Sequence, residues 1–90
     1  MKPLRWTLHA LATLNDRNIN RAEVEETLSA PELTVLDPPR RVVPMRRYYD
    51  TQLERQMLLR VVVEETLYER VVVTAYKTSQ IARYLRESAR

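Results

Sequence analysis

The chain has 90 residues, of which 44% are hydrophobic and 30% charged, a formal net charge of +3, and neither cysteine nor glycine. This composition fits one globular domain, residues 1–90, and excludes disulfides, thiolate metal sites and the glycine-rich loops that bind nucleotides. Because no apolar run approaches the roughly 18 residues of a membrane span and no signal peptide is recognisable, we expect a soluble, cytoplasmic protein that does not bind membranes.

The first third of the chain predicts two short helices. Thr7 precedes apolar residues at helical spacing, so it is expected to cap a helix that ends near Asp16. Asn18 then stands where a left-handed residue is needed, and asparagine is the best substitute for glycine there. Asn20, with a glutamate three residues later, forms a capping box that predicts a second helix over residues 21–29.

The remaining two thirds predict a sheet and a last helix. Pro44 indicates that part of one strand lies at a sheet edge or a bulge. The fold class is therefore α+β, with two N-terminal helices, an antiparallel sheet of three or four strands and a C-terminal helix. We expect strands at about 33–37, 42–49, 57–64 and 70–77, and a helix at about 80–89 capped by Ser79.

The late hairpin assigns side chains to faces, because side chains alternate along a strand. With Glu64 opposite Arg70 across a five-residue turn, one face is wholly apolar and should be covered by helices. That apolar face comprises Leu59, Val61, Val63, Val71, Val73 and Ala75. The opposite face is mixed and comprises Leu58, Arg60, Val62, Val72, Thr74 and Tyr76. Either Arg46 or Arg47 must also lie on the mixed face, and the sequence does not say which.

The mixed face is the first candidate for a functional site. It offers Arg60, Thr74 and Tyr76, with Lys77 just beyond. Cations around a phosphodiester can stabilise the charge that develops when a ribose 2′-hydroxyl attacks the adjacent phosphorus, and a tyrosine or lysine could move the proton. The alternative is an ordinary exposed sheet face, on which tyrosine and threonine are common.

His9 is the single histidine and lies in the first turn of the first helix, where the helix dipole favours the neutral imidazole. A neutral imidazole could accept a proton, or the residue could be purely structural. Without cysteine or a second histidine, no transition-metal site is expected.

The positive charge is concentrated in the second half of the chain. Residues 1–39 hold four basic and six acidic residues, a balance of −2, whereas residues 40–90 hold eleven and six, a balance of +5. Thirteen of the fifteen basic residues are arginines, which bind phosphate through two parallel hydrogen bonds. Arg83, Arg86 and Arg90 also form a stripe on the last helix. These arginines favour a polyanionic partner or an acidic protein, and a solvated basic surface is the alternative.

Several short motifs resemble a known family. They are His9-Ala10, Asp16-Arg17-Asn18-Ile19-Asn20, Glu23-Val24-Glu25-Glu26, Leu59-Arg60-Val61-Val62-Val63, and Val72-Val73-Thr74-Ala75-Tyr76 with Thr78-Ser79. The pattern resembles a widespread prokaryotic domain of unknown function that is similar to the BrnT toxins, within the RelE/ParE-like toxin superfold. Thr13 departs from the family, because an arginine is common there, and Asn18 replaces a glycine.

The resemblance implies a metal-independent endoribonuclease without a cofactor, inhibited by a cognate acidic antitoxin. In this reading Arg60 and Lys77 bind the scissile phosphate, and Tyr76 or His9 transfers protons. The positions expected to hold RNA are Arg17, Arg40, Arg41, Arg46, Arg47, Thr78, Ser79 and Arg83. The alternative is a catalytically inactive, toxin-like interaction module that binds a protein partner through the same face or through an exposed strand edge.

Overall fold

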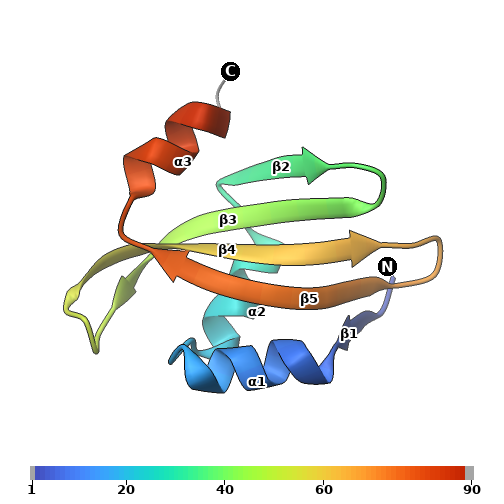
Figure 1. Ribbon diagram of the computed structural model, residues 1–90, viewed down its shortest axis with the longest axis horizontal. Coiled ribbons are helices and arrows are strands. Elements are labelled where there is room, and N and C mark those ends of the chain that lie inside the picture. The colour runs from blue at the N-terminus through green and yellow to red at the C-terminus, as the bar shows by residue number, and fades with distance from the viewer. Residues whose placement is uncertain (1, 89–90) are drawn as a thin grey trace.

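The computed structural model describes residues 2–88, which form a five-stranded sheet with three helices (Figure 1). The elements are β1 (Leu4–Trp6), α1 (Leu8–Asp16), α2 (Arg21–Ser29), β2 (Leu33–Asp37), β3 (Arg41–Asp50), β4 (Arg55–Glu65), β5 (Arg70–Thr78) and α3 (Ile81–Ser88). The strands lie in the order β1-β5-β4-β3-β2, with β1 parallel to β5 and every other pair antiparallel.

The expected α+β class and the four expected strands are confirmed, but the sheet is larger than expected and mixed. The fifth strand, β1, has only three residues and pairs with Arg70–Val72. A segment of three residues is too short to show a periodic pattern. Its strand conformation depends on pairing with a partner more than sixty residues away in sequence. Residue 89, at the end of the expected last helix, lies outside the described residues.

Both N-terminal helices begin at the residues that the sequence indicates. The Thr7 side chain accepts a hydrogen bond from the Ala10 N–H, and the Asn20 side chain accepts one from the Ala22 N–H. Asn18 has φ 54°, the left-handed conformation predicted for it. Side chains close in sequence therefore accept hydrogen bonds from free N–H groups at the start of each helix, and Asn18 turns the chain between α1 and α2.

The register of the β4–β5 hairpin differs from the prediction. Glu65, not Glu64, pairs with Arg70, so the turn has four residues, and a register shift lies between Val62 and Val63. Beyond that shift Arg60 pairs with Tyr76, two residues from the Thr74 predicted. Because a shift of two preserves the alternation of side chains, the two residues still share a face.

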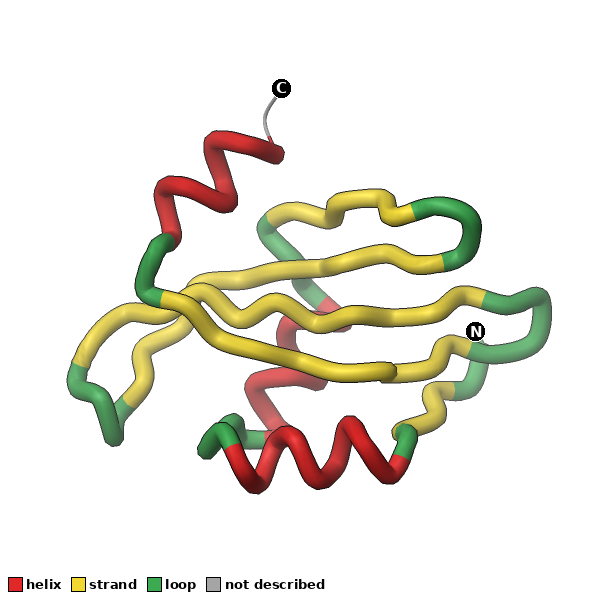
Figure 2. The backbone as a smooth tube through the Cα atoms, viewed as in Figure 1, coloured by secondary structure: helices red, strands yellow, loops and turns green. Residues whose placement is uncertain are grey.

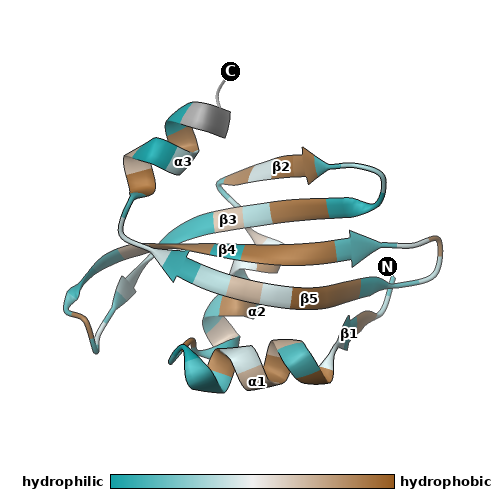
Figure 3. Ribbon diagram, viewed as in Figure 1, coloured by the Kyte–Doolittle hydropathy of each residue, from teal (hydrophilic) through white to brown (hydrophobic). Residues whose placement is uncertain are grey.

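The hydrophobic core has two parts, one on each side of the sheet. One cluster lies under α1 and α2, and the second lies under α3. Figure 3 shows hydrophobic stretches along β3, β4 and β5, the strands between these helices. The buried members of the first are Ala10, Leu14, Ile19, Val24, Tyr48, Met57, Leu59, Val61, Val63, Val72 and Ala75. Those of the second are Val43, Met45 and Leu58, with Leu33, Val35, Val62, Ile81, Tyr84 and Leu85 packed against them.

Three expectations about the sheet faces are therefore corrected. Val71, expected on the face under α1 and α2, is not part of that cluster. Val72 belongs to the cluster under α1 and α2, because the register shift reverses the alternation within the run of three valines. The other face, which we call the α3 face, is not fully open. Ile81, Tyr84 and Leu85 of α3 cover the apolar part that Leu58 and Val62 contribute.

The turns lie at two ends of the sheet (Figure 2). The β2–β3 and β4–β5 turns lie at one end, where the Glu65 N–H donates to the Arg40 carbonyl at 2.7 Å. The β3–β4 turn and the start of α3 lie at the other. Within residues 2–88, none of the helices has the length and hydropathy needed to span a membrane.

Candidate functional site

The α3 face carries an arginine held between two tyrosines. Arg60 on β4 donates from Nη1 to the hydroxyl of Tyr76 on β5. The Arg60 guanidinium carbon also lies 4.3 Å from the centre of the Tyr84 ring on α3, within cation–π range. Tyr76 lies beside Arg60 because the two residues are paired across β4 and β5. Tyr84 reaches Arg60 from α3, the helix that follows β5. All three side chains are partly buried.

Arg60 has no carboxylate partner among the described residues, and its Nε is buried without a hydrogen bond. Aromatic faces and a phenol stabilise a guanidinium only in part, because they do not neutralise its charge. A buried donor left without an acceptor carries a desolvation cost. The arrangement therefore favours an added anion that could accept hydrogen bonds from this guanidinium.

Lys77 does not join this group. It lies next to Tyr76 in sequence and therefore faces the other side of the sheet, opposite Leu59. Its ammonium is 2.7 Å from Asp50 Oδ2 and donates to the Asn18 carbonyl at 3.1 Å. The side chains of Lys77 and Asp50 are only 13% and 6% exposed.

Asp50 is the centre of this second polar group. It accepts hydrogen bonds from Tyr48, Lys77 and the N–H groups of Gln52 and Leu53. The hydrogen bond from Lys77 is the largest cause that lowers the pKa of Asp50, to about 2. Burial, followed by the Asp50 charge, raises the pKa of Tyr48. The group joins the β3–β4 turn to β5 and to the α1–α2 connection.

The two neighbouring arginines of β3 separate as expected. Arg47 is the one on the α3 face, where it pairs with Glu32 at 2.9 Å, and this contact lowers the pKa of Glu32. Arg46 faces α2 and pairs with Glu23 at 2.7 Å. A glutamate therefore neutralises each of these two arginines.

His9 and Arg17 lie on α1 or at its end, away from the Arg60 face. His9 is exposed, and its Nε2 is 3.5 Å from the Thr13 hydroxyl. Arg17 donates to the Ala75 carbonyl at 2.9 Å, where β5 extends beyond the end of β1. Since α1 packs on the opposite side of the sheet, the structure does not bring His9 to Tyr76.

The remaining predicted residues lie at both ends of the sheet. Arg40 and Arg41 belong to the β2–β3 turn and the start of β3. Thr78 and Ser79 lead into α3, and the Thr78 hydroxyl accepts from the Gln80 N–H at 3.1 Å. Arg83 on α3 is exposed and donates to the Gln80 side chain. Among the predicted site residues that the structure describes, Arg60 and Tyr76 are joined by a hydrogen bond on the α3 face.

Sequence reasoning missed Tyr84 and Asp50. Tyr84 follows Ile81 by three residues and precedes Leu85, so the apolar spacing of α3 could have placed it towards the sheet. Asp50 ends a strand and begins a turn, and only its buried environment distinguishes it from a common turn residue. The described residues contain no group of three or more His, Asp or Glu residues that could hold a metal ion.

Comparison with known proteins relates the chain to a family of domains. Residues 6–77 match a family model described as "Domain of unknown function (DUF4258)". The match covers most of the chain and includes α1, α2, Arg60 and Tyr76. It also includes the five-stranded sheet, except the first two residues of β1 and the last residue of β5. No curated protein and no solved structure shows a significant match.

Proposed function

The chain belongs to the DUF4258 family of domains of unknown function, and from that premise we propose that it is a toxin-like RNA-binding domain with metal-independent endoribonuclease activity. The observation that carries the proposal is the Arg60 guanidinium, which lies on the α3 face with two tyrosines and without a carboxylate partner among the residues that the structure describes. The basic second half of the chain supports an anionic polymer as ligand. The resemblance to BrnT and RelE-like toxins supplies the reaction class.

In the proposed reaction a ribose 2′-hydroxyl attacks the adjacent phosphorus and the bond to the 5′-oxygen breaks. Arg60 would donate to a non-bridging oxygen, whose negative charge grows in the transition state. Tyr76 accepts a hydrogen bond from Arg60, so its own O–H proton is free to be donated to the departing 5′-oxygen. Water accepts the proton that the 2′-hydroxyl loses during the attack, and water afterwards returns a proton to the Tyr76 phenolate. The products are a 2′,3′-cyclic phosphate and a 5′-hydroxyl.

The test is cleavage of single-stranded RNA by the wild type, Arg60→Ala and Tyr76→Phe. We expect Arg60→Ala to slow cleavage by about 100-fold or more, because an electrostatic stabiliser of the transition state is lost. Tyr76→Phe keeps the ring and removes only the hydroxyl, so it should slow cleavage by a similar order if the phenol transfers a proton.

Arg55→Ala is the matched control. Arg55 is an exposed arginine at the start of the same strand, β4, and has no role in the proposed site. It should cleave RNA at the wild-type rate. Equal rates for all four proteins, or the same loss in Arg55→Ala as in Arg60→Ala, would contradict the roles proposed for Arg60 and Tyr76.

The second candidate function is a toxin-like interaction module without catalytic activity. The position of α3 favours it, because Tyr84 lies over Arg60 and restricts the approach of a phosphate. Salt dependence distinguishes the two candidates. RNA binding through phosphate contacts should weaken by orders of magnitude between about 50 and 200 mM salt. An interaction module should bind RNA at neither salt concentration.

A further inference from the structure

The end of the sheet furthest from α3 presents large apolar side chains to solvent. Leu67 and Tyr68, in the β4–β5 turn, are 86% and 81% exposed, and Leu36 at the end of β2 is 74% exposed. Arg40 of the β2–β3 turn lies between them. A hollow of about 530 Å³ is lined by Arg40, Leu67 and Tyr68 among others, and a second, of about 230 Å³, by Leu36 and Arg40. We call Leu36, Arg40, Leu67 and Tyr68 the turn-end surface.

The turn that carries Leu67 and Tyr68 is held in place by Thr66. The Thr66 hydroxyl accepts from the N–H groups of Tyr68 and Glu69 and donates to the Glu69 carbonyl. The Thr66 N–H also donates to the Glu69 carbonyl, and Lys2 donates to the Thr66 carbonyl at 2.8 Å. The two exposed side chains are therefore presented on an ordered turn, which lowers the entropy cost of binding a partner.

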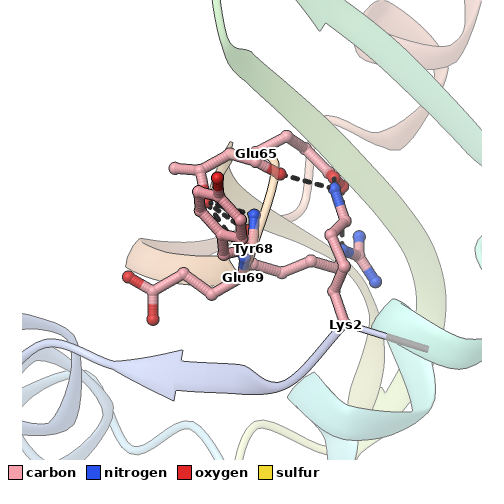
Figure 4. Close-up of polar contacts among 6 residues, drawn as sticks. Lys2, Glu65, Tyr68 and Glu69 are labelled. Carbon is pink, nitrogen blue, oxygen red and sulfur yellow. Dashed lines mark hydrogen bonds and ion pairs between the residues drawn. The ribbon is translucent and has the colours of Figure 1, made fainter.

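The carboxylates beside this turn are already neutralised by cations, and Figure 4 shows the contact between Glu65 and Lys2. Glu65 accepts from Lys2 at 2.6 Å and from Arg70 at 2.8 Å, and the hydrogen bond from Lys2 is the main cause that lowers the pKa of Glu65. Glu69 points away from that pair and binds Arg5 through both oxygens, with distances from 3.0 to 3.2 Å. Three cations thus balance two carboxylates, so the turn itself carries no unpaired negative charge.

Arg40 is different, because its side chain has no ion pair or hydrogen bond with any residue that the structure describes. The strand register puts Asp37 and Glu64 opposite its neighbour Arg41, not opposite Arg40. The charged group at the turn-end surface that lacks a protein partner among the described residues is therefore an exposed guanidinium next to apolar side chains. Tyrosine and arginine are among the residues enriched where binding energy concentrates in protein interfaces.

We propose that the turn-end surface, formed by Leu36, Arg40, Leu67 and Tyr68, is a docking site for a protein segment that carries a carboxylate beside apolar side chains. Charge complementarity selects this occupant: the carboxylate would pair with Arg40, and the apolar side chains would cover Leu67 and Tyr68. The site lies at the opposite end of β5 from Tyr76 and α3, so the proposal is independent of the proposed RNA cleavage.

A phage-displayed library of short random peptides, selected on the full chain, tests the proposal. The enriched peptides should contain Asp or Glu flanked by apolar residues. Synthesised singly, they should bind the double variant Leu67→Ser/Tyr68→Ser at least about tenfold more weakly, because the apolar contacts are lost. Arg40→Glu should weaken binding as well. Leu53→Ser is the matched control, since Leu53 is an exposed leucine in the β3–β4 turn at the other end of the sheet, and it should bind like the wild type.

A second measurement needs no variant. Amide chemical-shift changes in the wild type on addition of the enriched peptide should centre on Leu36, Asp37 and Arg40 and on residues 66–69. The proposal is overturned if no peptide is enriched, if the enriched peptides are basic, or if the shift changes centre elsewhere. Equal binding to the double variant, or shift changes at these residues with a single-stranded RNA oligonucleotide and not with the peptides, overturns it too. Because peptide binding is read without RNA cleavage, failure of either proposal leaves the other testable.

Discussion

Asp50 and Lys77 show how a single residue's environment changes its predicted role. Lys77 was expected beside the scissile phosphate, but the alternation of side chains along β5 sends it to the face opposite Tyr76. There it neutralises a carboxylate with 6% side-chain exposure. Two buried, paired charges with further hydrogen bonds are a stabilising arrangement only while both partners remain. The placement therefore predicts an effect of Lys77 on stability.

Replacing Lys77 by Met should lower the free energy of unfolding by about 3 kcal/mol, because it leaves the Asp50 carboxylate without its cation. Urea unfolding at neutral pH measures the change. The double variant Asp50→Asn/Lys77→Met is the control, since it removes both charges and should lose less than the sum of the single variants. Additive losses would show that the pair is not coupled.

The same pair predicts a pH dependence. The pKa of Asp50 is about 2 in the folded protein and about 4 when unfolded, so its stabilisation is complete above pH 4. It should be lost as pH falls from about 4 towards 2, because the unfolded chain then binds a proton more readily. Asp50→Asn should show a smaller loss over this interval. Parallel stability curves for the two proteins would contradict the assigned pKa.

At the scale of elements, sequence signals between near neighbours were sufficient to predict helix starts. Pairing between strands that are distant in sequence could not be predicted in the same way. Thr7 and Asn20 could be predicted as caps, because a cap depends on neighbours within three residues. The strand β1 could not be, since its pairing is with β5. The shift in register within Val71–Val73 was also out of reach, because three identical side chains give no sign of where alternation breaks. Arg60 and Tyr76 were placed on one face only because the error in register was even.

Thr7 connects α1 to β5, so its replacement tests how contacts between elements contribute to stability. Its hydroxyl caps α1 and donates to the Val72 carbonyl at 3.2 Å, and its N–H donates to the same carbonyl. Thr7→Ala should lower the free energy of unfolding by about 1–2 kcal/mol, from loss of the cap and the contact with β5. Thr34→Ala, an exposed threonine of β2, is the matched control and should change stability little.

At the scale of the whole molecule, the sheet separates two polar groups. The Asp50–Lys77 pair lies on the side of α1 and α2, and Arg60 lies with Tyr76 and Tyr84 on the α3 face. The sequence predicted the concentration of basic residues, but ion pairs neutralise several of them. Arg46 and Arg47 each bind a glutamate, which no charge count along the chain could reveal. Within residues 2–88 Arg60 has no carboxylate partner, which distinguishes it from Arg46 and Arg47 in the sheet.

The most direct test of the proposed endoribonuclease activity at Arg60 is to incubate the purified chain with single-stranded RNA in excess EDTA and to analyse the ends of the products. The proposal predicts cleavage that persists under chelation and gives 2′,3′-cyclic phosphate and 5′-hydroxyl ends, with the fragments absent or strongly reduced for Arg60→Ala. Intact RNA with the wild type, or the same fragments at the same rate with Arg60→Ala, would contradict it.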